Sequence, residues 1–227
     1  MSSDRPLLYV GPTAFGVDPT LISHGGVTVL PPVRRGDIDN LLASGVKPGV
    51  IAIVDGTFHS YPSVGHAEIR AALKKGWDVW GLSSMGAIRA REMTILGMKG
   101  FGKVYRHYEE TPDFDDDEVT LIHAAEAPYQ PLSEPLIHFR EALQGLVAQQ
   151  RITVTTAEEI AGFLKRRWYA ERTLRLFKES LVNVGGLSPD EASNEIRNLD
   201  DHRIKTHDLV SFLEVKPWLS QSSLPAA

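Results

Sequence analysis

Four short apolar segments, separated by longer stretches of helical pattern, limit the folds open to this chain. They are LLYVG (7–11), VTVLPP (27–32), VIAIVDG (50–56) and WDVWGL (77–82). Each has the length and composition of a buried strand. Between the last two, residues 63–76 have the apolar spacing of a helix that ends at Gly76. Strands that alternate with helices in this way predict an α/β fold, a parallel-sheet core with helices on both faces.

The rest of the chain has a different pattern. A further helix is expected after Ser84, ending before Gly97. Residues 101–126 are aromatic and then strongly acidic, which indicates an irregular segment leading into a helix near Val119–Ala125. Beyond it the apolar spacing is helical. The expected parts are an α/β core over 1–126, a helical C-terminal region packed on the core over 127–219, and a tail over 220–227.

The composition excludes several classes of function. The 227 residues have a net charge of −5, so binding to nucleic acid is not expected. There is no cysteine, which excludes disulfides, thiolate metal sites, cysteine nucleophiles and a persulfide carried by this chain. Without a membrane-spanning run or a signal-peptide pattern, the expected location is the cytoplasm, away from any membrane. The residues leave the oligomeric state open, and a homo-oligomer is compatible with them.

Polar and charged side chains follow each of the four expected strands. Ligands of open parallel sheets bind beyond the carboxyl ends of the strands, so these side chains are expected to meet in one crevice. The candidate residues are Thr13, Arg34, Arg35, Asp55, His59, Ser83 and Ser84. A carboxylate, an imidazole, two guanidinium groups and several hydroxyls suit a small anion or an acyl group.

Each candidate also has a purely structural interpretation. Asp55 precedes a glycine and could only form a turn, His59 could be an ordinary packed or surface residue, and Ser83 or Ser84 could only cap a helix. Capping and anion binding use the same exposed N–H groups, so the two interpretations are compatible. Neither serine completes a G-x-S-x-G elbow, and no Walker loop or G-x-G-x-x-G fingerprint is present.

The acidic run Asp113 to Glu118, with His107 or His123 nearby, is a candidate magnesium site. It lacks the spacing of a paired-carboxylate or H-E-x-x-H site, and runs of charge are usually solvated. We therefore expect neither a metal nor an organic cofactor.

Several motifs occur together and in a fixed order. They are YVGP (9–12), PPVRRGDI (31–38), DGTFH (55–59), SMGAIRA (84–90) and DDDEVTLIH (115–123). Through them the chain resembles the TfuA-like proteins over roughly residues 7–125, and more loosely beyond about residue 150.

The resemblance implies a partnership with YcaO-type enzymes, which use ATP to activate a backbone amide so that sulfur can replace its oxygen. It also implies a sulfur source, a ubiquitin-like carrier of the ThiS type with a C-terminal thiocarboxylate, while a precursor peptide is engaged indirectly. Asp55, His59 and Ser84 belong to the core motifs. From their side chains we expect Ser84 to attack or to donate to an oxyanion, and His59, oriented by Asp55, to act as base.

Arg34, Arg35, Thr13 and Ser83 are the expected binding residues for the acyl anion. Two other functions stay open. One is a non-catalytic docking or allosteric subunit that recruits or activates the YcaO enzyme through its C-terminal helices, using Trp168, Tyr169 and Phe177. The other is a separate hydrolase or binding protein for small acids.

Overall fold

The computed structural model of the chain describes residues 5–58, 61–111 and 115–220. One sheet has the strand order β2-β1-β3-β4-β5, and every neighbouring pair is parallel. The strands are β1 (Leu7–Tyr9), β2 (Thr28–Leu30), β3 (Val50–Ile53), β4 (Asp78–Leu82) and β5 (Lys99–Phe101). The four expected strands and the α/β class are confirmed.

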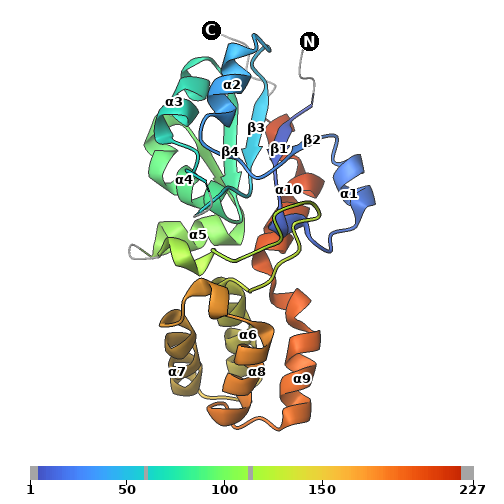
Figure 1. The fold of residues 1–227 in the computed structure, drawn as a ribbon, viewed down its shortest axis with the longest axis vertical. Helices are drawn as coiled ribbons and strands as arrows, with labels where there is room; N and C mark the ends of the chain where they lie inside the picture. The colour runs from blue at the N-terminus through green and yellow to red at the C-terminus, as the bar shows by residue number, and fades with distance from the viewer. Residues whose placement is uncertain (1–4, 59–60, 112–114, 221–227) are drawn as a thin grey trace. The chain divides into compact units, whose positions relative to one another are not determined.

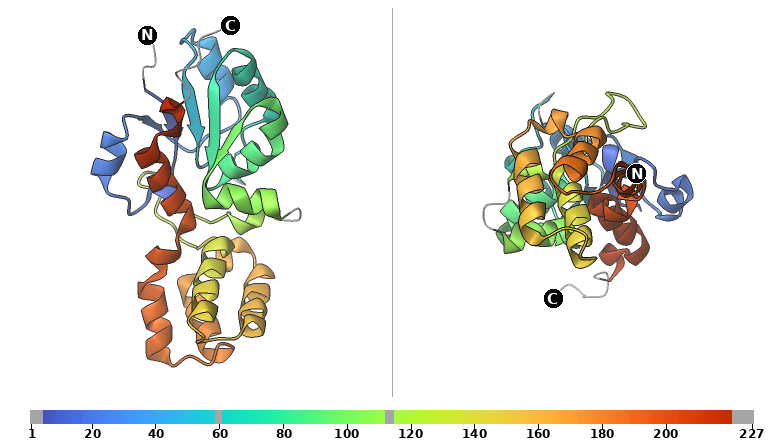
Figure 2. Two further views of the ribbon diagram at one scale, coloured as in Figure 1. Left: turned by 180° about the vertical axis from the view of Figure 1, so that it is seen from behind. Right: turned by 90° about the horizontal axis from the view of Figure 1, so that it is seen from below.

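Helices cover both faces of this sheet (Figures 1 and 2). The first set comprises α2 (Asp37–Ala43), α3 (His66–Lys74) and α4 (Met85–Met93). On the opposite face, Leu209 and Phe212 of α10 (Ile204–Val215) pack against Ala52 and Trp80. The same apolar cluster takes in residues near η1 (Pro12–Ala14) and α1 (Pro19–His24). Because side chains alternate along a strand, Ile51 and Ile53 point away from this cluster while Ala52 and Val54 point into it.

The segment from residue 101 to 126 differs from the expectation. It opens with helix α5 (Gly102–Glu110), preceded by the short strand β5, so the prediction of an irregular segment is wrong there. The helix expected near Val119–Ala125 is also absent from the described chain, where a single turn, η3 (Asp116–Glu118), is followed by irregular residues. No side chain from its own N-cap residue caps α5. Instead, the Asp208 carboxylate on α10 accepts hydrogen bonds from Lys103 N and Val104 N at 2.6 and 2.9 Å.

The chain divides into two compact units, Met1–Phe114 with Lys205–Ala227, and Asp115–Ile204. The sequence places the boundary after residue 126 and assigns the last helix to the C-terminal region, whereas the structure returns α10 to the unit that holds the sheet. The short turns η2 (Thr94–Leu96) and η6 (Pro217–Leu219) belong to this first unit. Of the expected tail over 220–227, only residue 220 lies among the described residues.

The second unit is helical and has its own core. Phe139, Leu143, Leu164, Phe177 and Leu181 are buried in it, and the Phe139 and Phe177 rings stack with centroids 4.3 Å apart. Its elements are α6 (Leu136–Ala148), α7 (Val154–Lys165), η4 (Tyr169–Glu171), α8 (Leu174–Asn183), α9 (Pro189–Arg197) and η5 (Leu199–His202). In the described parts of both units, no helix combines the length and apolar character needed to cross a bilayer.

Candidate functional site

The strand order has a switch point at the carboxyl edge of the sheet. Strand β2 lies on one side of β1 and β3 lies on the other. The loops that leave the neighbouring strands β1 and β3 therefore run in opposite directions along the sheet. Such a switch point is where open α/β sheets bind ligands. Here the loops carry Thr13 and Asp55.

Asp55 is 2% exposed and its carboxylate is fixed by the loop after β1. Gly11 N and Thr13 N donate to its Oδ2 at 2.9 and 3.0 Å, and the Thr13 hydroxyl donates to Oδ1 at 2.7 Å. Successive backbone N–H groups of this kind form an anion-binding concavity. In this protein the concavity holds its own carboxylate, which locks the two loops together.

The turn from β4 into α4 is strained. Ser83 has a φ of 62°, which L-residues rarely adopt, and Ser84 N donates to Leu82 O at 2.7 Å. Hydrolases place a nucleophile at such a strand-to-helix turn. The Ser83 side chain, however, is fully buried and donates to the Lys205 carbonyl oxygen at 2.8 Å. Ser83 therefore anchors the turn.

Ser84 has the N-cap position of α4, but its side chain makes no capping hydrogen bond. One N–H group of the first turn of α4 is instead bonded to the residue that follows β3, since Gly86 N donates to Val54 O at 3.2 Å. A Cβ at Gly56 would come within 2.7 Å of the Met85 side chain, so the Asp55 turn and the first turn of α4 are in contact. Ser84 is 2% exposed, its hydroxyl does not cap α4, and its neighbour Met85 contacts the turn that follows Asp55.

The two arginines lie at the same edge with different surroundings. Val33 N donates to Asp55 O at 3.0 Å, which joins their segment to the Asp55 turn. Arg34 is exposed, and its guanidinium carbon lies 4.1 Å from the centre of the Tyr61 ring. Arg35 donates to Ser63 O at 2.8 Å and lies 3.8 Å from a Glu68 oxygen.

The structure thus joins Thr13 directly to Asp55 and places Ser83, Ser84 and the segment of Arg34 and Arg35 next to them. His59 lies outside the described residues. The sequence offered no sign of two further contributors, Lys205 and Thr206, which lie in the first turn of α10. The Lys205 carbonyl receives the Ser83 hydroxyl, and the Thr206 hydroxyl donates to Thr13 O at 3.1 Å. Only an alignment of related chains could have revealed partners separated by 122 and 193 positions.

Compared with known protein families, the chain matches that of the TfuA-like proteins over residues 55–173, more than half of its length. The chain belongs to the TfuA-like family. A comparison with curated proteins found no match. In this TfuA-like protein the matched region begins at Asp55 and includes Ser83 and Ser84, but it leaves out Thr13 and α10.

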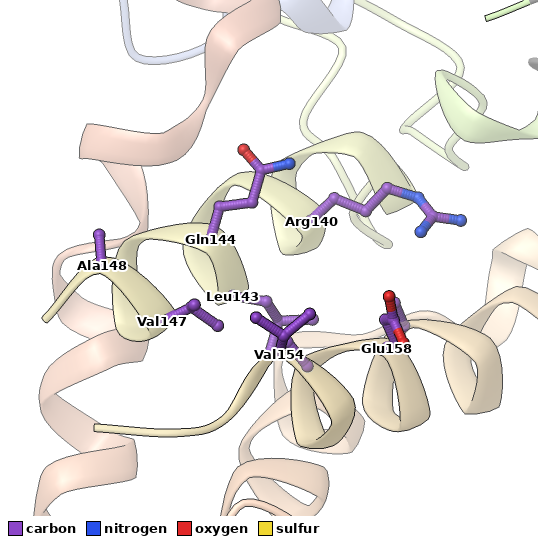
Figure 3. A pocket seen from close by; sticks show the side chains of 9 residues that line it. Arg140, Leu143, Gln144, Val147, Ala148, Val154 and Glu158 are labelled. Atoms are coloured by element: carbon purple, nitrogen blue, oxygen red, sulfur yellow. The ribbon is translucent and has the colours of Figure 1, made fainter. Parts of the chain in front are cut away.

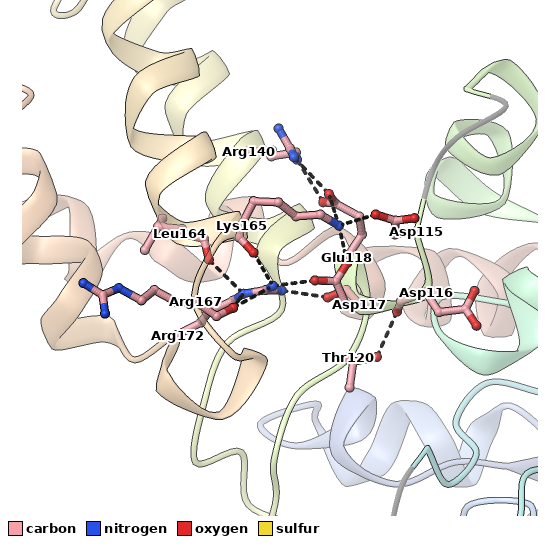
Figure 4. Close-up of polar contacts among 10 residues, drawn as sticks. All are labelled: Asp115, Asp116, Asp117, Glu118, Thr120, Arg140, Leu164, Lys165, Arg167 and Arg172. Atoms are coloured by element: carbon pink, nitrogen blue, oxygen red, sulfur yellow. Dashed lines mark hydrogen bonds and ion pairs between the residues drawn. The ribbon is translucent and has the colours of Figure 1, made fainter.

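The described part of the acidic run, residues 115–118, belongs to the second unit of the TfuA-like protein and is held by basic side chains (Figure 4). Arg140 donates through two nitrogens to the Glu118 carboxylate, each at 2.9 Å. Asp117 forms ion pairs with Lys165 and Arg172. Asp115, Asp117 and Glu118 are thus engaged by basic side chains, and no metal-binding cluster is found among the described residues.

The second unit also has an apolar groove of about 370 Å³ between α6 and α7 (Figure 3). Leu143, Val147 and Val154 line its apolar part, while Arg140 and Glu158 stand on facing helices at its polar part. No nucleophile with an adjacent base lines it. The groove is therefore suited to binding an apolar group, and its lining residues suggest no catalytic reaction.

Glu134 is a buried carboxylate in the second unit. Its Oε1 lies 2.5 Å from His138 Nδ1, and both of its oxygens accept hydrogen bonds from Arg203 at 3.1 Å. Burial alone would raise the pKa of Glu134, but the hydrogen bond with His138 and the charges of His138 and Arg203 outweigh it and lower the pKa from 4.5 to about 2.

We expect Glu134 to make the stability of the protein acid-sensitive. A carboxyl group with a lowered folded-state pKa stabilises the fold fully above its unfolded value of 4.5, and this contribution is lost as the pH falls toward 2. Urea unfolding should therefore show a gap between wild type and Glu134→Gln that is wide at pH 6 and closes toward pH 2.5. The exposed Glu158→Gln serves as the control. An equal difference in unfolding free energy between wild type and Glu134→Gln at both pH values would contradict the lowered pKa of Glu134.

Proposed function

We propose that this TfuA-like protein is an accessory protein for backbone thioamide formation in ribosomally made peptides and works with a YcaO-type enzyme. It releases sulfide from the thiocarboxylated C-terminus of a ThiS-type carrier, and it meets the precursor peptide only indirectly. Membership of the family supports the pathway. The lack of cysteine supports the carrier, because no thiol of this chain can hold the sulfur as a persulfide. The site of action in this proposal is the cytoplasm, where the YcaO enzyme has ATP.

The observation that carries this function is the Ser84 hydroxyl, which stands at the N-cap of α4 without making a capping hydrogen bond. The N–H groups at a helix N-terminus and the helix dipole stabilise negative charge that develops on an acyl oxygen. The turn is held on both sides, by the Gly86–Val54 hydrogen bond and by the Ser83–Lys205 hydrogen bond. A fixed donor loses little free energy to reorganisation when the charge appears.

The reaction is a hydrolysis in which a thiocarboxylate and water give a carboxylate and hydrogen sulfide. In one form Ser84 Oγ bonds to the acyl carbon, its proton passes to His59, the C–S bond breaks, and water then hydrolyses the ester. In the other, water attacks directly and Ser84 donates to the oxyanion. The Asp55 carboxylate has about four acceptor positions, of which three are filled by the 11–13 loop, so one is left for an imidazole.

Arg34 is the stronger of the two arginines as a binding group for the carrier tail. Both arginines are exposed, but Arg34 is stacked on Tyr61, whereas Arg35 is engaged by Ser63 and Glu68. A guanidinium pairs with the planar thiocarboxylate through two N–H groups. Thr13 and Ser83 support the site by holding its loops.

Sulfide release from thiocarboxylated carrier, with the purified protein alone and neither YcaO enzyme nor ATP, tests this function. Wild type should release sulfide, and Ser84→Ala, His59→Ala and Asp55→Ala should each lower the rate by about 100-fold, the usual cost of losing one catalytic donor or base. The exposed Ser44→Ala is a matched control that should keep the full rate. Circular dichroism verifies that each variant is folded.

Unchanged release in all three variants would refute the assignment of the site. The apolar groove between α6 and α7 favours the second candidate function, a docking or allosteric subunit of the YcaO enzyme. In that case the isolated protein releases no sulfide, yet thioamide formation by the YcaO enzyme still requires it.

A further inference from the structure

Arginine and tryptophan side chains are exposed together where α7 ends. Arg166 and Arg167 are exposed, and Trp168 is 58% exposed, whereas Trp77, Trp80 and Trp218 are only 3–7% exposed. Tryptophan is highly buried on average, and exposed tryptophan with arginine is enriched at protein interfaces. We call Phe163, Arg166, Arg167 and Trp168 the Arg-Trp surface.

The charge of this part of the chain is opposite to that of the whole. From Phe163 to Lys178 there are six Lys and Arg residues and one acidic residue, although the chain carries a net charge of −5. Lys165 and Arg172 are paired with Asp117. Among the described residues, by contrast, Arg166 and Arg167 have no carboxylate within the 4.0 Å of an ion pair, and the Arg167 guanidinium lies 4.8 Å from the Phe163 ring.

The buried Arg172 side chain fixes the backbone of the Arg-Trp surface (Figure 4). The Arg172 side chain is 1% exposed and donates to the carbonyl oxygens of Leu164, Lys165 and Arg167 at 3.0–3.2 Å. Leu164 and Lys165 belong to the last turn of α7, and Arg167 lies just beyond it. Carbonyl oxygens at the end of a helix have no partner within the regular helical pattern, so donors such as Arg172 stabilise this end. A surface whose backbone is already fixed binds a partner with less loss of conformational entropy.

We propose that the Arg-Trp surface binds an acidic segment of a partner protein, one that carries an apolar side chain next to its carboxylates. The two unpaired guanidinium groups complement the carboxylates, and the Trp168 ring covers the apolar side chain. The surface belongs to the second unit and shares no residue with the Ser84 site of the first unit, so this inference does not depend on sulfide release.

Binding is measured by fluorescence anisotropy with a labelled eight-residue peptide of Asp, Glu and Leu, and with the same peptide carrying Lys at the acidic positions. The acidic peptide should bind and protect Trp168 from iodide, a quencher that reaches mainly this tryptophan because the other three are buried. The double variant Arg166→Glu/Arg167→Glu, and separately Trp168→Ala, should weaken binding at least about tenfold. Arg175→Glu, the same type of substitution at a single arginine of α8 that is 86% exposed, should leave it within about twofold.

Without peptide, iodide should quench Trp168 more strongly than caesium, and the double variant should reverse this order. Equal affinity for the acidic and basic peptides would overturn the proposal, as would full affinity in the double variant. Tighter binding of a single-stranded oligonucleotide, lost in the same variants, would also overturn it, because the surface would then serve nucleic acid.

Discussion

Gly86→Ala is expected to lower the free energy of unfolding by more than about 4 kcal/mol. A Cβ at this position would overlap the carbonyl oxygen of Ile53, an atom of the central strand β3 that cannot move without breaking the sheet. Gly81 on β4 is equally restricted, because its added Cβ would overlap Gly86 O. The helix would have to lift off the sheet, which would also break the hydrogen bond from Gly86 N to Val54 O.

Chemical denaturation followed by circular dichroism measures this loss. Gly162→Ala is the matched control, because Gly162 is a helical glycine of α7 whose added Cβ would meet only the Arg166 side chain at 3.5 Å. There the same substitution should be neutral or stabilise by up to about 1 kcal/mol, since it removes backbone freedom from the unfolded chain. Equal effects at the two positions would refute the close approach of α4 to β3.

Arg172→Met is expected to destabilise the second unit by about 3 kcal/mol, because buried carbonyl oxygens lose a charged hydrogen-bond donor. The Asp117 carboxylate, which is 35% exposed, keeps its ion pair with Lys165 and adds little to this loss. The Arg172 guanidinium joins Asp117, through its side chain at 2.5 Å and its carbonyl at 2.8 Å, to the carbonyls that end α7. Methionine fills similar space but donates no hydrogen bond, so several buried acceptors lose their partner at once. The Arg-Trp surface should lose its fixed backbone as well.

Hydrogen exchange of α7 and α8 reports this loss within the second unit, independently of the sheet. Exchange in Arg172→Met should be faster by about two orders of magnitude or more, following the free energy of opening. Arg175→Met removes an exposed arginine 3.5 Å from Glu179 and should change stability by less than about 0.5 kcal/mol. Unchanged protection of α7 in Arg172→Met would contradict the role of the guanidinium.

Both substitutions depend on contacts that local sequence patterns do not encode. The prediction for residues 101–126 failed for the same reason. Helix α5 has no capping side chain of its own, and the carboxylate that caps it, Asp208, is about a hundred positions away. Strand β5 is short and contains Gly100, where a Cβ would overlap the Tyr105 ring. Such a segment has neither the apolar length nor the local cap from which a strand or helix is predicted.

In the candidate site, too, some features could be predicted from the sequence and others needed the structure. The motifs identified the family and marked Asp55 and Ser84, because residue identity at short spacing is local information. The roles of their neighbours needed coordinates: Thr13 proved to be a donor to Asp55, and Ser83 proved to be tied to α10. Neither role follows from the residue type, since a hydroxyl can bind a ligand, cap a helix or fasten a loop equally well.

By itself the sequence determined the four main strands, the helices between them and the α/β class, because apolar periodicity is fixed within a dozen residues. Tertiary structure alone decided that α10 returns to the sheet and that the buried Arg172 fastens the end of α7. It also decided that Gly86 lies directly on β3. These arrangements join residues distant along the chain, and their free energy arises only when packing brings the partners together and excludes water from between them.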